Sequence, residues 1–111
     1  MALRAVNTVT AAGVATNFTA VAASDTIASS DIGSRGVIYE VNNASGGSIN
    51  VTVVDPGFSP AGNAGTSVVN AVANGTRERM FIGPQHVDPA TGVATINHSG
   101  TSSVTAEAYR Y

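Results

Sequence analysis

Apolar and polar residues alternate along much of the chain, and the alternation is clearest in residues 36–42 and 48–54. Each of these segments places three apolar side chains on one face, which is the pattern of a strand with one buried side. The loop between them, residues 43–47, is rich in residues that tolerate positive φ. The two segments are therefore predicted to pair as an antiparallel hairpin.

Weaker alternation predicts further strands at residues 67–72, 77–82, 93–98 and 104–111. Turn residues such as Asn74-Gly75 and Gly83-Pro84 separate them, and residues 58–66 form a loop too long for a tight hairpin. Valine, threonine, isoleucine, serine, asparagine and glycine dominate, and leucine occurs once. This pattern predicts an all-β fold, an antiparallel β-sandwich, with a small barrel as the alternative.

The first 35 residues have a different character. They are of low complexity and poor in large apolar side chains apart from Phe18. We predict an extended N-terminal arm over residues 1–35, with a first strand near residues 17–22, and a sandwich domain over residues 36–111. An arm of this composition normally frays in a free monomer, so we expect neighbouring subunits to hold it.

Composition narrows the classes of partner. The chain has 111 residues, a formal net charge of -2 and no lysine, and its five arginines are scattered, so it lacks the basic footprint of a nucleic-acid binder. Only 11% of residues are charged, against about 25% in typical soluble domains, which indicates a surface packed against other proteins. With no cysteine, no apolar signal-peptide region and no run of about 20 apolar residues, we expect a cytoplasmically made protein with no membrane contact.

Candidate chemistry is sparse. His86 lies two residues from Asp88, but no further ligands occur at a diagnostic spacing, and His98 ends a predicted strand. No G-x-S-x-G motif occurs, and the acidic residues are mostly isolated. We therefore predict no catalytic, cofactor-binding or metal-binding residues, and no enzymatic activity.

Contact residues are easier to suggest. Arg77 and Arg79 share one face of a predicted strand, and they indicate either an edge protected by charge or a patch for an acidic partner surface. Tyr109 and Tyr111 share one face of the last strand, where they serve an interface or close the core. The predicted arm adds the basic side chain of Arg4 and the aromatic side chain of Phe18. The partner-contact candidates are therefore Arg4, Phe18, Arg77, Arg79, Tyr109 and Tyr111.

Three stretches carry a family resemblance: VIYEVNNASGGSINVTVVDPG, NGTRERMFIGP and DPATGVATINHSGTSSVTAEAYRY. Together they resemble small β-rich virion proteins of tailed bacteriophages, over residues 36–111. The segments SGGSINVTVV and GP…DPATGVATI are the most specific. The resemblance implies a structural component of the phage particle, most directly a capsid decoration (cement) protein, and it implies no catalytic residues.

The expected partners are the major capsid protein and neighbouring copies of the chain, with a trimer favoured and the exterior of the head as the location. Such a protein would bury surface against the capsid subunits at many equivalent sites, and this repetition would make its binding to the shell strong. Two alternatives remain open. One is a head–tail connector or tail component, and the other is a virion-surface carbohydrate-binding module that stacks sugars on Tyr39, Tyr109 or Tyr111.

Overall fold

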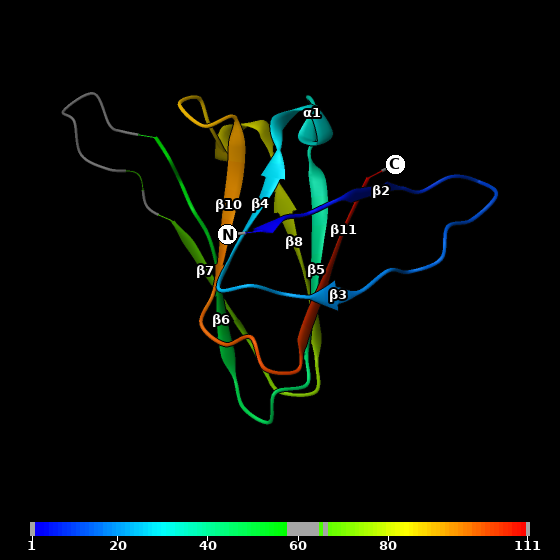
Figure 1. The fold of residues 1–111 in the computed structure, drawn as a ribbon, viewed down its shortest axis with the longest axis vertical. Coiled ribbons are helices and arrows are strands. Elements are labelled where there is room, and N and C mark those ends of the chain that lie inside the picture. Colours follow the sequence, from blue (N-terminus) through cyan, green and yellow to red (C-terminus); the bar gives the residue numbers. More distant parts are fainter. Residues whose placement is uncertain (1, 58–64, 66, 111) are drawn as a thin grey trace.

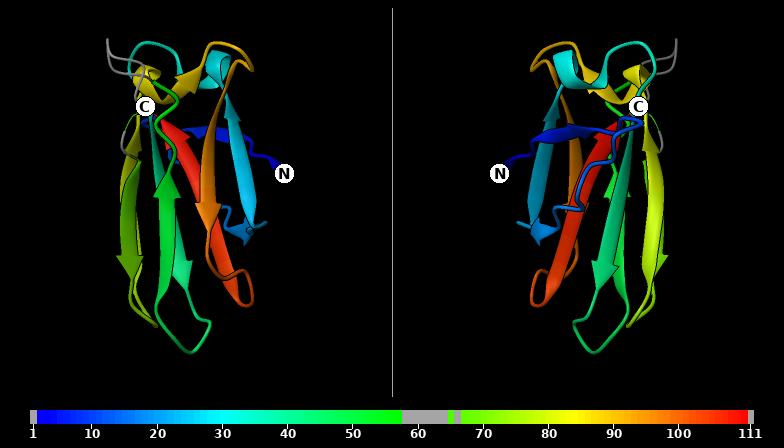
Figure 2. Two further views of the ribbon diagram at one scale, coloured as in Figure 1. Left: turned by 90° about the vertical axis from the view of Figure 1, so that its left-hand side faces the viewer. Right: turned by 90° about the vertical axis from the view of Figure 1, so that its right-hand side faces the viewer.

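A computed structural model describes residues 2–57, 65 and 67–110, and these residues form two mostly antiparallel β-sheets (Figure 1). The longer strands of both sheets run along the long axis of the molecule in the side views of Figure 2, whereas the short strands near the N-terminus cross it. In the part described, the sheets do not close into a barrel. The predicted all-β fold is therefore confirmed, and its sandwich form is the one observed.

Each sheet has one long path of paired strands. Sheet 1 has the order β1 (Ala2–Leu3), β4 (Ser24–Ala28), β10 (Val93–His98), β6 (Ile49–Val53) and β7 (Val68–Val72), and the short β9 (Val87–Asp88) also pairs with β10. Sheet 2 has the order β2 (Val6–Thr8), β11 (Val104–Arg110), β5 (Val37–Asn43) and β8 (Arg77–Ile82), and β3 (Thr19–Ala20) also pairs with β11. The pairs β1–β4 and β2–β11 are parallel and the others are antiparallel. Two short helical segments lie in connections, α1 (Ser29–Ile32) and the 3-10 segment η1 (Pro84–His86).

The core lies between the two sheets and follows the predicted alternation. In β5 the odd-numbered positions from Val37 to Asn43 are buried, and in β6 the buried positions are Ile49, Val51 and Val53. A fully buried aliphatic side chain of this size contributes about 1.5–3 kcal/mol relative to an exposed one. The strands stay together because their apolar faces meet in one cluster.

The predicted hairpin between β5 and β6 is wrong. β5 pairs with β11 and β8 in sheet 2, whereas β6 pairs with β10 and β7 in sheet 1, so the loop between them crosses from one sheet to the other. The side chain of Asn43 stabilises this crossing loop by hydrogen bonds. Its buried amide donates to the carbonyl oxygens of Gly47 at 2.8 Å and Val72 at 2.9 Å, and its Oδ1 accepts from Ser45 N and Oγ.

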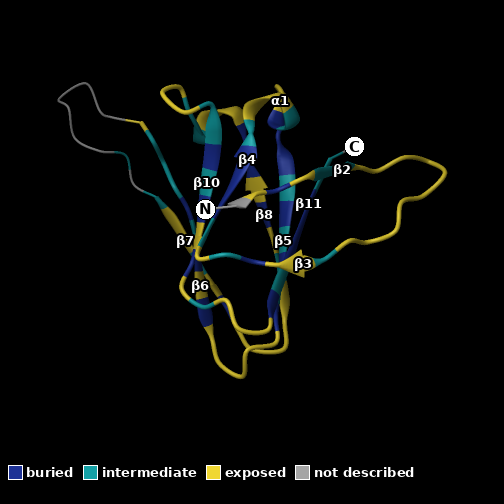
Figure 3. Ribbon diagram, in the orientation of Figure 1, coloured by how far each residue is buried: buried dark blue, intermediate teal, exposed yellow. Residues whose placement is uncertain are grey.

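The predicted arm also needs correction. β4 pairs with β10 over five residues, and Ile27 and Ile32 belong to the core, so the predicted arm contributes β1, β2, β3 and β4 to the sandwich. The strand expected near residues 17–22 is only the two-residue β3. The β2–β3 loop (residues 9–18) keeps the arm's exposed character, and it is yellow for most of its length in Figure 3. The loop predicted at residues 58–66 lies, apart from Gly65, outside the described residues.

Candidate partner surface and buried polar cluster

The outward face of sheet 2 gathers most of the predicted contact residues. The strand register aligns three rows of side chains across β8, β5 and β11. These rows are Phe81, Ile38 and Tyr109; Arg79, Glu40 and Glu107; and Arg77, Asn42 and Thr105. We call this set the outer face of sheet 2.

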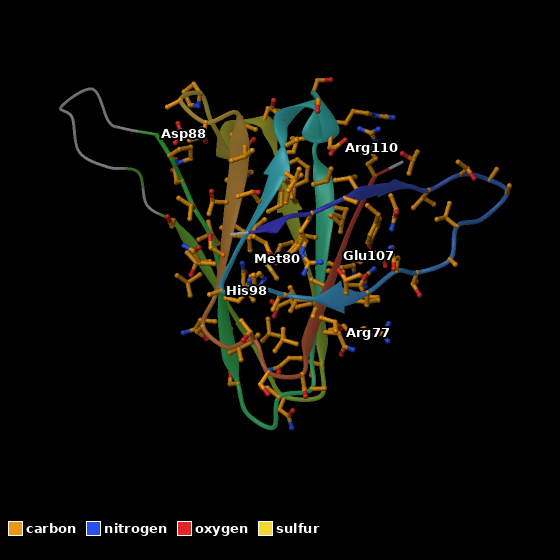
Figure 4. The ribbon with its side chains drawn as sticks, viewed as in Figure 1. Arg77, Met80, Asp88, His98, Glu107 and Arg110 are labelled. Atoms are coloured by element: carbon orange, nitrogen blue, oxygen red, sulfur yellow. The ribbon has the colours of Figure 1, made fainter. Side chains whose placement is uncertain are left out.

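Phe18 and Arg77 meet on this face although 59 positions separate them. The Arg77 guanidinium carbon lies 4.9 Å from the centroid of the Phe18 ring, which is a cation–π geometry. Phe18 precedes β3, beside which Arg77 is labelled in Figure 4, so the β2–β3 loop returns across sheet 2. A cavity of about 170 Å³, lined by loop residues as well as by Glu40 and Tyr109, separates part of the loop from the sheet.

Tyr109 sits between opposite charges on the same face. Its hydroxyl donates to Glu40 Oε1 at 3.4 Å, and the positive charge of Arg79 acts on the same hydroxyl. Partial burial, and then the charge of Glu40, raise the pKa of the Tyr109 hydroxyl, while Arg79 acts in the opposite direction. The phenol therefore remains a neutral hydrogen-bond donor near pH 7, and it lies where a partner can reach it.

Glu107 is the buried acid of this face. It is 7% exposed, and Asn7 of β2 donates from Nδ2 to its Oε1 at 3.1 Å. Glu40 lies directly opposite it in the ladder, and Arg79 lies opposite Glu40. The row thus places the Arg79 guanidinium beside the Glu40 carboxylate at its exposed end, which gives the surface both signs of charge.

Arg4 has an internal role and is not a surface contact residue. It is 8% exposed, and its Nε donates to Asp25 Oδ2 at 2.9 Å. Its Nη1 donates to Thr19 Oγ1 at 2.6 Å and to the Ala106 carbonyl at 3.1 Å, and its Nη2 donates to the Ala20 carbonyl at 2.8 Å. One guanidinium therefore links β4 of sheet 1 with β3 and β11 of sheet 2.

His98 and Tyr39 form a second buried polar contact between the two sheets. The Ala22 carbonyl can only accept a hydrogen bond, so His98 Nδ1, at 2.9 Å, must carry the proton. His98 Nε2 then accepts from the Tyr39 hydroxyl at 2.8 Å. Burial lowers the pKa of His98 and raises the pKa of Tyr39 above its usual range. Both groups are therefore neutral near pH 7, and they hold two strands of opposite sheets together.

The structure thus separates the predicted residues into groups. Phe18, Arg77, Arg79 and Tyr109 lie on the outer face of sheet 2, Arg4 lies inside, and Tyr111 lies outside the described residues. Sequence reasoning missed Phe81, which is 50% exposed on the same face. The signal was present, since a strand period of two places residue 81 beside residues 77 and 79.

The other candidates are also placed. Tyr39 is 0% exposed, so it offers no platform for a sugar. His86 Nδ1 accepts from the Gly83 N–H at 3.0 Å, and within the described ranges no group of three or more His, Asp or Glu side chains could hold a metal ion. Across the same residues, no helix has the length and apolar character needed to cross a bilayer. Comparison of the chain with protein-family models, with curated proteins and with solved structures found no match.

Proposed function

We propose that this chain is a non-enzymatic structural protein of a tailed phage virion, and specifically a capsid decoration protein that binds the major capsid protein on the outside of the head. One observation carries the proposal. The two segments with the most specific resemblance to phage virion proteins are residues 45–54, which contain β6, and the stretch from Gly83 to Ile96, which contains the first four residues of β10. These strands are neighbours in sheet 1, paired through Ile96 and Val53.

The outer face of sheet 2 is the surface we assign to the capsid partner. It presents Phe81, Tyr109 and two arginines, which are residue types that dominate the energy of protein interfaces. The face is built on three paired strands, so little conformational freedom remains to be lost when a partner binds. Many equivalent sites on a shell then turn a modest contact into strong retention.

The experiment uses phage heads that lack the protein. We expect purified heads to lose DNA at a lower temperature without the protein, and to recover their stability when the purified chain is added back. Cryo-electron microscopy of the restored heads should show hundreds of copies on the outer surface. Unchanged thermal stability, together with no density on the head, would refute the proposal.

Copy number separates this function from the alternative. Six or twelve copies at the head–tail joint would identify a connector component, and copies along the tail would identify a tail protein. Either result would keep the structural role and would overturn the decoration role.

A further inference from the structure

The sheet edges of the described chain differ in their protection against strand pairing. On one side of the sandwich the edge strands β1, β2 and β3 are two or three residues long. On the other side, β8 carries Arg77, Glu78 and Arg79 along its length. Short and charged edges resist pairing with other chains. Apart from the two-residue β9, which pairs only with β10, the remaining edge of the described strands is β7 (Val68–Val72), which is five residues long and contains no charged residue, proline or glycine.

β7 is also regular, and four of its five residues are at least partly exposed, whereas Val72 is buried. All five of its residues are in register with β6, with no bulge to turn the edge away. Val68 is 53% exposed and Val69 is 58% exposed. Figure 1 shows β7 at the outer margin of the sandwich, and no described strand pairs with its free side. Its backbone therefore offers a template for one more strand.

We propose that the occupant is β7 of a second copy, which pairs antiparallel about a two-fold axis through Asn70. This register places Val68 opposite the second copy's Val72 and Val69 opposite its Ala71, and Asn70 faces itself. Each apolar residue then meets an apolar residue, and an amide meets an amide. No like charges face each other, because the strand has none.

The symmetry of the strand is what favours a second copy over a different protein. A two-fold contact requires a surface that complements itself, and the order apolar, apolar, amide, apolar, apolar reads the same in both directions. β8 fails this test, because a two-fold pairing would place Arg77 opposite Ile82 and Glu78 opposite Phe81. A strand from another protein would need no such symmetry in β7. The inference replaces the expected trimer with a dimer and does not depend on capsid binding.

The register can be tested by cross-linking because the chain has no cysteine. In the proposed dimer, two Asn70→Cys residues face each other with Cα atoms about 4.5–5.5 Å apart, within the range of a disulfide. Val68→Cys is the matched control, since its two copies would be about 14 Å apart along the strands. Mild oxidation should yield a covalent dimer for Asn70→Cys and little for Val68→Cys. The reverse result, or equal yields, would overturn the register.

The interface itself is tested by mass. We expect sedimentation velocity at micromolar concentration to give twice the 11.1 kDa chain mass. Val69→Lys should raise the dimer dissociation constant by about tenfold or more, because the change removes two apolar cross-strand pairs. Val14→Lys, on the exposed β2–β3 loop, should leave the constant unchanged. A native monomer, a native trimer or a dimer indifferent to Val69→Lys would overturn the proposal, whatever the outcome on phage heads.

Discussion

Replacing Arg4 with methionine should destabilise the protein strongly although the side-chain length is nearly kept. The change removes a buried guanidinium that makes an ion pair with Asp25 and hydrogen bonds to β3 and β11. Asp25 is 1% exposed, and it also accepts hydrogen bonds from the Ala22 N–H at 3.3 and 3.4 Å. Leaving one charge of a buried pair without its partner costs about 3–5 kcal/mol.

That loss is large for a single domain, whose total stability is about 5–15 kcal/mol. At about 4 °C per kcal/mol for a chain of this size, Tm should fall by about 12–20 °C. Urea unfolding followed by circular dichroism gives the free energy of unfolding, and calorimetry gives Tm. The control is Arg77→Met, which removes an exposed cation–π contact and should cost about 0.5–1 kcal/mol.

A second variant isolates the electrostatic part of the effect. Asp25→Asn in the Arg4→Met background removes the unpaired charge, so the double variant should be more stable than the sum of the two single changes predicts, by about 0.5–3 kcal/mol. If Arg4→Met costs less than about 1 kcal/mol, or if the two substitutions are additive, then the guanidinium does not act as a buried link between the sheets.

Three further predictions address the interior, a turn and the outer face. Because burial lowers the pKa of His98, the free energy of unfolding should be highest above about pH 6.5 and should fall as the pH drops below it. Urea titrations at pH 7.5 and 5.5 measure this difference, which His98→Gln should remove and the control His86→Gln should keep. Gly36 has φ +80°, and a Cβ there would lie 2.6 Å from the Phe81 ring, so Gly36→Ala should lower the free energy of unfolding by about 1–3 kcal/mol. An unchanged free energy of unfolding would contradict this backbone geometry. Phe81→Ser should weaken binding to phage heads by about tenfold or more while circular dichroism shows a folded protein, and unchanged binding would exclude this face as the capsid contact.

The alternation of side chains predicted the strands well but not their partners. β5, β6, β8 and β10 lie within a residue or two of their predicted bounds, and the buried apolar positions of β5 and β6 are the expected ones. The wrong hairpin shows the limit of this reasoning. A strand with one apolar face can pair with its neighbour in sequence or face that neighbour across the core, and both arrangements bury the same side chains. The choice here depends on Asn43, whose amide bonds reach Val72, 29 positions away.

The first 35 residues were misjudged for a related reason. β4 contains a buried aspartate, and a carboxylate in a strand reads as solvent-facing unless its partner is known. That partner is Arg4, which lies 21 positions earlier. In the sequence, Arg4 looks like one of several scattered arginines. On the outer face, by contrast, Arg77, Arg79 and Tyr109 could be found from the sequence, because alternation alone decides which way they point.

The link between Arg4 and the Ala106 carbonyl has a consequence for the order of folding. The two residues are 102 positions apart, so β2 can pair with β11, its partner in sheet 2, only after the strands between them have been synthesised. During translation, the hydrogen bond from Arg4 to the Ala106 carbonyl cannot form until residue 106 has left the ribosome, and contacts of such long sequence separation form slowly. The strands β2 and β11 thus pair late, and the Arg4 link between the two sheets is completed with them.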